Sequence, residues 1–183
     1  MDTTQLFLGE IHRQCNFALI AYEAMKTSIL IMEQGDNKEL DHFWYSVQSF
    51  LVAVANISKI LWPTAPCGLV VPPDLGARRD NLRTLLSIDE SSILKSRTFR
   101  NHFEHYDFRI EEWAKKTTDL TIVDSNVVPS YLIAGYSEKS KMRNFDPDTF
   151  VLTFGNRSYQ FLDVVDEVRE LLDKIKRATL KQS

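Results

Sequence analysis

Arg100, Asn101 and His105 are the residues of this sequence whose types and spacing could support a reaction. Histidine titrates near neutral pH and can accept a proton from a hydroxyl group, while arginine stays charged beside a phosphate. Cleaving RNA without a metal ion requires both functions, because a base must deprotonate the 2′-hydroxyl and a cation must offset charge on the phosphate. These residues therefore permit metal-independent RNA cleavage, which leaves a 2′,3′-cyclic phosphate and a 5′-hydroxyl end.

The segment 97–113 is predicted to be one amphipathic helix that carries these residues. Five apolar side chains recur at steps of three and four and predict a core-facing stripe: Phe99, Phe103, Tyr106, Ile110 and Trp113. Asn101 and His105 lie one turn apart on the polar side, and Asn101 could orient the imidazole or the phosphate. Arg100 is about 140° from His105 around the helix, so the two diverge on a single chain.

A second subunit could complete the site, because a twofold axis would bring Arg100 of one copy toward His105 of the other. Phe108 lies in the middle of the polar face, where a large aromatic side chain favours a partner surface. We therefore expect a homodimer in which Phe108 marks the contact.

The arrangement Arg100-Asn101-x-x-x-His105, late in a helical chain, resembles the motif of the HEPN family. The resemblance covers roughly residues 5–118 and 162–181. It implies a bundle of four to five helices and, in catalytic members, a metal-independent endoribonuclease whose motifs meet across a dimer cleft. It also implies a role as a toxin or in phage defence, with an antitoxin as a candidate protein partner. One branch of the family has Tyr two positions after the His, where this chain has Asp107, and this difference argues against that branch.

Other assignments use the same helix. Arg97 and His102 have the same separation, although Asn101 directly follows the arginine only in the Arg100 register. Glu104 is four residues after Arg100 and could form an ion pair with it.

His105 also has a simpler interpretation, as a solvated or ion-paired histidine beside Glu104 and Arg109. His102 and His105 lack a third ligand at helical spacing, so we expect neither a metal site nor a cofactor.

A non-catalytic alternative is a HEPN-like interaction module that binds a protein partner. The formal net charge of −3 and the pI near 5.8 favour it, because RNA binding depends mainly on contacts with phosphates. Six of the eleven arginines lie between residues 78 and 109 and could form a local anion-facing patch if the fold gathers them.

Length and composition predict a single domain over residues 1–183, since 44% of the residues are apolar. The N-terminus lacks the features of a signal peptide, and no run of about 18 apolar residues suggests a membrane span. The two cysteines have no paired spacing that would indicate zinc or a disulfide. We expect a cytoplasmic protein without membrane contact.

The predicted fold class is mainly α, with a small antiparallel β insertion at 119–161 before the last helix. Helices are expected over 3–32, 39–61 and 77–86, then from Asp89–Ser92 into the motif segment, and finally over 163–181. Residues 62–76, rich in proline, should be non-helical. Strands are predicted over 120–123 and 131–136, and the segments 150–154 and 157–161 should form a hairpin around Gly155-Asn156.

Overall fold

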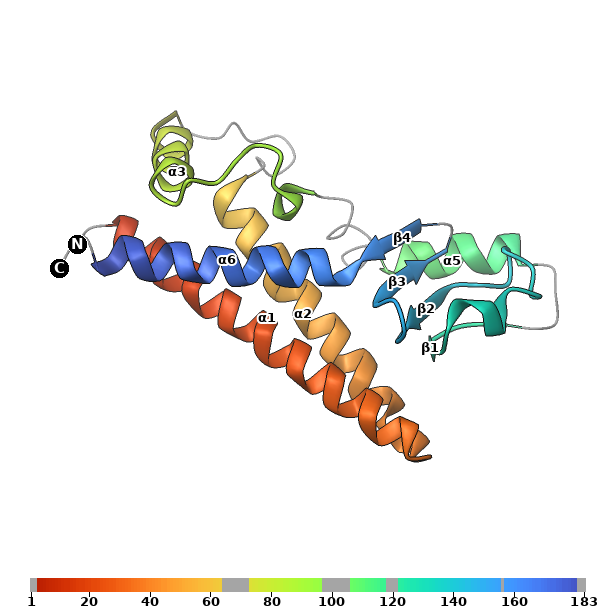
Figure 1. Ribbon diagram of the computed structural model, residues 1–183. Helices are drawn as coiled ribbons and strands as arrows, with labels where there is room; N and C mark the ends of the chain where they lie inside the picture. Colours follow the sequence, from red (N-terminus) through yellow and green to blue (C-terminus); the bar gives the residue numbers. More distant parts are fainter. Residues whose placement is uncertain (1–2, 64–72, 97–105, 118–121, 156, 181–183) are drawn as a thin grey trace.

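The computed structural model describes residues 3–63, 73–96, 106–117, 122–155 and 157–180. These residues contain five α-helices and one four-stranded sheet that directly precedes the last helix (Figure 1). The helices are α1 (Thr3–Glu33), α2 (Leu40–Leu61), α3 (Pro73–Leu85), α5 (Tyr106–Lys116) and α6 (Phe161–Leu180). The coarse prediction of a mainly α protein with a small β insertion is therefore confirmed.

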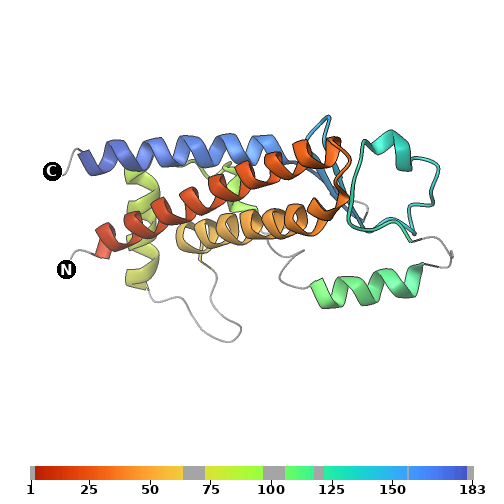
Figure 2. The ribbon, with the colours of Figure 1, turned by 90° about the horizontal axis from the view of Figure 1, so that it is seen from below.

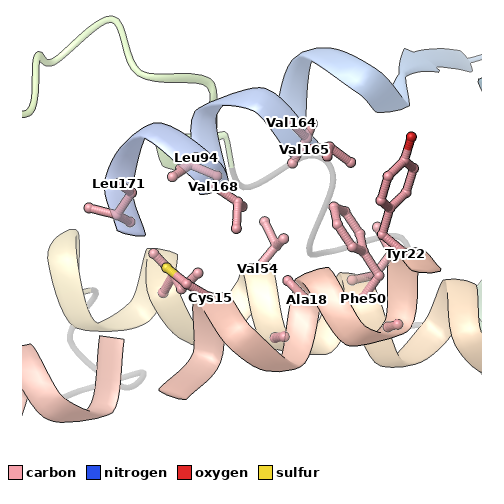
Figure 3. Close-up of a cluster of buried hydrophobic side chains, with 14 of the residues drawn as sticks. Cys15, Ala18, Tyr22, Phe50, Val54, Leu94, Val164, Val165, Val168 and Leu171 are labelled. Carbon is pink, nitrogen blue, oxygen red and sulfur yellow. The ribbon is translucent and has the colours of Figure 1, made fainter. Parts of the chain in front are cut away.

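Helices α1, α2 and α6 form the core of the molecule. Helix α2 carries an apolar stripe whose members are all buried: Phe43, Val47, Phe50, Leu51, Val54, Ile57 and Leu61. On α6, Val164, Val168 and Ile175 are buried, together with both Leu171 and Leu172. Figure 3 shows Val168 of α6 above Cys15 and Val54, with Leu94 beside α6 in the same buried cluster.

Cys15 lies in this core with no exposed surface, and burial raises the pKa of its thiol to about 12. A thiol that stays protonated is a poor nucleophile, so Cys15 is a packing residue. Two polar contacts fix the neighbouring helices α1 and α2: Asn56 Nδ2 donates to Gln14 Oε1 at 3.3 Å, and Ser28 Oγ donates to Glu39 Oε2 at 3.0 Å.

Helix α1 is also the one described helix whose length and composition would allow it to cross a membrane, with a mean hydropathy of 1.2 in the relevant window. A core helix of a soluble protein meets the same test, and α1 buries Leu8, Ile11 and Met25. Cytoplasmic location therefore stays a prediction.

The sheet contains β1 (Asn126–Val127), β2 (Arg143–Asp146), β3 (Val151–Phe154) and β4 (Arg157–Gln160), in that spatial order. Strand β1 is parallel to β2, and the other two pairs are antiparallel. The predicted hairpin is confirmed as β3–β4, and Gly155 adopts the left-handed conformation, with φ of 57°, at its turn.

Aromatic rings join the sheet to the bundle. The Phe161 ring, at the start of α6, lies 4.3 Å from the Phe50 ring and 5.8 Å from the Phe145 ring of β2, measured between centroids. Farther along, Trp44 Nε1 of α2 donates a 2.8 Å hydrogen bond to the carbonyl of Ser125. The insertion is thus anchored to α2 and α6 through specific side chains.

Several predicted elements were wrong. The segment 131–136 is not a strand, because Ser130–Ile133 forms a 3-10 helix (η3) whose Tyr131 and Leu132 are exposed. Helix α3 begins at Pro73 instead of 77, which suits proline at a first helical position. No α-helix starts at Asp89–Ser92, where one was expected. A short 3-10 helix, Ile93–Lys95 (η2), follows this segment. Of 120–123, the described part contributes one parallel bridge, Val123 with Lys141.

Candidate functional site

All three predicted catalytic residues, and three of the secondary candidates, fall in the segment 97–105, which lies outside the described residues. These are Arg100, Asn101 and His105, with the secondary candidates Arg97, His102 and Glu104. Two of the predicted site residues are described, Phe108 and Arg109, and both belong to α5. This helix begins at Tyr106, immediately after His105 in the chain.

The described part of α5 presents a different buried face from the one predicted. Phe108 is 58% exposed, as its predicted place on the polar face of the helix indicated. Ile110 is 37% exposed, so its assignment to a core stripe was wrong. On the described part of α5, the side chains of Arg109, Glu112 and Trp113 are half-buried. This helix runs beside the β insertion and apart from the bundle helices (Figure 2).

A pocket of about 330 Å³ lies between this face of α5 and the insertion. We call it the α5 pocket. Its basic side chains are those of Arg109, Lys116, Lys139, Lys141 and Arg157, and its acidic side chains are those of Glu112 and Glu138. Trp113, Met142 and Phe154 form an apolar wall, with Gly155 beside them. Its formal charge of +3 is opposite in sign to the net charge of the whole chain.

Hydrogen bonds hold the walls of the α5 pocket together. The hydroxyl of Thr117, just after α5, lies 2.7 Å from the carbonyl oxygen of Lys139 and 2.9 Å from that of Trp113. The Gly155 N–H donates to the Met142 carbonyl at 2.6 Å and fixes the hairpin turn against the same segment. The pocket is therefore built from three segments that are distant in sequence.

Ion pairs neutralise part of the positive charge. Arg109 Nη1 lies 3.0 Å from Glu112 Oε2, and Lys141 Nζ lies 2.6 Å from Glu138 Oε1. Lys116 and Lys139 form no ion pair with another residue of the described ranges, and both are exposed. The positive charge that remains is thus located where a ligand could reach it.

Two N–H donors in the pocket wall are buried and lack an acceptor within the part of the chain that the structure describes: Arg109 Nε and Trp113 Nε1. A buried donor without a partner costs about 1–3 kcal/mol. Nearby, burial raises the pKa of Tyr159 although Arg157 and Arg109 lower it in part, so this phenol is neutral at neutral pH. The feature of the pocket that suits an anion is therefore its exposed positive charge.

One arginine of the stretch considered as an anion-facing patch, Arg83, has a structural role. Arg83 is largely buried, contacts Asp80, pairs with Glu90 at 3.1 Å, and donates to the Leu61 carbonyl at 2.6 Å. It therefore connects α3 to the end of α2. The described residues also include no group of three or more His, Cys, Asp or Glu side chains that could hold a metal ion.

Four basic residues of the α5 pocket were not singled out from the sequence: Lys116, Lys139, Lys141 and Arg157. For Lys139 and Lys141 the local signal is the run of charged residues in 138–143, which by itself is typical of a solvated loop. Comparisons with protein families, curated proteins and solved structures found no match for this chain.

Proposed function

We propose that this protein is a HEPN-like, metal-independent endoribonuclease that acts as a homodimer, with Arg100, Asn101 and His105 as its catalytic residues. The observation that carries the proposal is the positively charged α5 pocket, which is built on the described residues that follow the motif in the chain. Phosphate contacts supply most of the affinity for RNA, so a local positive surface suits an RNA enzyme whose chain is acidic overall.

Each catalytic residue has a distinct role in this proposal. His105 removes the proton from the 2′-hydroxyl, and Asn101, one turn away, orients the imidazole or the phosphate. Arg100 of the partner subunit stabilises the charge that develops on the phosphate, because the two side chains diverge on one helix. Two described features support this arrangement: the helical bundle with its terminal helix, and the exposure of Phe108 at the proposed subunit contact.

The proposal extends to biological context. An RNA-cleaving HEPN-like protein would act in the cytoplasm, as a toxin or in phage defence, and an antitoxin could restrain it.

His105→Ala tests the proposed function. We expect it to lower RNA cleavage by about 10²-fold or more, because a positioned base contributes that much to the rate. The measurement is cleavage of a labelled RNA in EDTA, with analysis of the product ends for a 2′,3′-cyclic phosphate and a 5′-hydroxyl.

His42→Ala is the matched control, since His42 is exposed and lies on α2. It should cleave as fast as the wild type, and circular dichroism should show that both variants are folded. Equal cleavage by the wild type and His105→Ala would contradict the proposal.

A non-catalytic interaction module is the second candidate function. Its support is an exposed apolar surface on the insertion, where Tyr131 is 72%, Leu132 58% and Tyr136 45% exposed. Clusters of exposed aromatic and aliphatic side chains are typical of protein-binding surfaces. A monomer in solution, whose RNA cleavage is independent of Arg100 and His105, would favour this function over the first.

A further inference from the structure

The α5 pocket combines two kinds of surface. Its basic side chains include Arg157 and Lys116, which approach from the sheet and from α5, and its wall is formed by Trp113, Met142 and Phe154. A bare anion would need only the positive charge. A basic rim beside an apolar wall instead matches a ligand that joins an anionic group to a flat, weakly polar ring.

The charge of the pocket determines the sign of the ligand. Lys116 and Lys139 are exposed at its rim, and its formal charge of +3 attracts an anionic group such as a phosphate and repels a cationic ligand.

The volume of about 330 Å³ is at the lower end of the range for small-ligand sites and is larger than a single phosphate group requires. A nucleotide unit satisfies the charge, the apolar wall and the volume: its phosphate meets the cations, and its base or ribose meets the apolar wall. Most of the lining comes from the insertion, so the proposed site uses residues other than those of the motif.

We propose that the α5 pocket binds one nucleotide of single-stranded RNA, with its phosphate held by Arg109, Arg157 and Lys116. The inference rests on the proposed function, to which it adds a substrate-binding subsite outside the catalytic motif. The subsite holds the strand while the motif residues act on a neighbouring linkage.

The test measures binding without cleavage. A fluorescein-labelled 2′-O-methyl oligoribonucleotide, which cannot be cleaved through its 2′-oxygen, is titrated with the full chain across a series of salt concentrations. The double variant Lys116→Gln/Arg157→Gln should weaken binding about ten-fold, and the salt slope should fall by about 1.4, which corresponds to two lost phosphate contacts on a single strand.

A second variant tests the apolar wall. Trp113→Ala removes the aromatic ring from the wall, and it should weaken binding about ten-fold with the salt slope unchanged. The matched control is Lys38→Gln/Lys176→Gln, which removes the same charge from exposed positions outside the pocket. This control should bind as the wild type does.

Equal losses in the pocket variant and the charge-matched control would overturn the proposal, because binding would then depend on total charge alone. Competition with adenosine monophosphate distinguishes the source of the phosphate. If the binding of adenosine monophosphate depends on the pocket residues and the binding of the oligonucleotide does not, the assignment to RNA is wrong. Since binding is measured without cleavage, this result is independent of whether His105→Ala abolishes activity.

Discussion

Asp146 is the residue whose ionisation has the most direct consequence for stability in the described structure. It is 5% exposed, and its carboxylate accepts N–H groups from Ser130 at 2.8 Å, Asp148 at 3.0 Å and Thr149 at 3.2 Å. Burial alone would raise the pKa of Asp146, but these donors outweigh it and hold the pKa below the ordinary value of 3.8. The charged form therefore stabilises the fold.

Asp146→Asn should lower the free energy of unfolding by about 1–3 kcal/mol at pH 7, because one acceptor oxygen becomes an NH2 group facing an N–H. A depressed pKa contributes stability above the unfolded-state value, and that contribution is lost as the pH falls through the folded-state value. The difference in the free energy of unfolding between the wild type and the variant should thus have its full value at pH 5–7 and decrease below about pH 3.8.

Urea unfolding at pH 7, 5 and 3 measures this difference. Asp148→Asn serves as the control, since Asp148 is exposed and uses its backbone N–H in the turn. A pH-independent difference for Asp146→Asn would show that shape, and not charge, accounts for its effect.

Among the elements, Phe161 joins the insertion to the bundle. It is completely buried, and its ring centroid lies 4.3 Å from that of Phe50, 5.8 Å from Phe145 and 6.4 Å from Tyr22. One side chain thus contacts α1, α2 and β2 at the point where the sheet ends and α6 begins.

Phe161→Ala should destabilise the protein by about 3–5 kcal/mol, the usual cost of removing a buried phenyl ring. Leu162→Ala, at the neighbouring 38% exposed position, should cost less than about 1 kcal/mol. Denaturant unfolding followed by near-UV circular dichroism compares the two. Similar losses would mean that the sheet and bundle are not coupled through this ring.

The elements that could be predicted are those that carry a complete pattern of their own. The stripe of α2, the stripe of α6 and the β3–β4 hairpin each encode their buried positions within a single segment. Strand β2 could not be recognised, because two of its four residues are polar side chains that are nevertheless buried, Asn144 and Asp146. Both hydrogen-bond to the segment 128–130, which is distant in sequence.

The segment 131–136 was predicted to be a strand and is not one, whereas β2 is a strand that was not predicted. The aromatic and branched residues of 131–136 favour a strand by composition, but Asn126–Val127 takes the place beside β2 and leaves Tyr131 and Leu132 exposed. The α5 pocket was missed for a related reason, since its cations come from 109–116, 138–141 and 157 and only the folded chain brings them together.

At the scale of the whole molecule, an acidic chain gathers positive charge in one pocket beside the helix that follows the motif. The proposed catalytic residues add a requirement on assembly, since Arg100 and His105 would diverge on the helix that the sequence predicts for 97–113. A single subunit is therefore expected to be inactive.

Subunit mixing tests this central claim most directly. Arg100→Ala and His105→Ala should each be inactive, and an equimolar mixture that has exchanged subunits should recover about one quarter of wild-type RNA cleavage. Half of its dimers are then mixed, and each mixed dimer has one intact site. A mixture that stays inactive, or single variants that cleave RNA as fast as the wild type, would contradict the composite site.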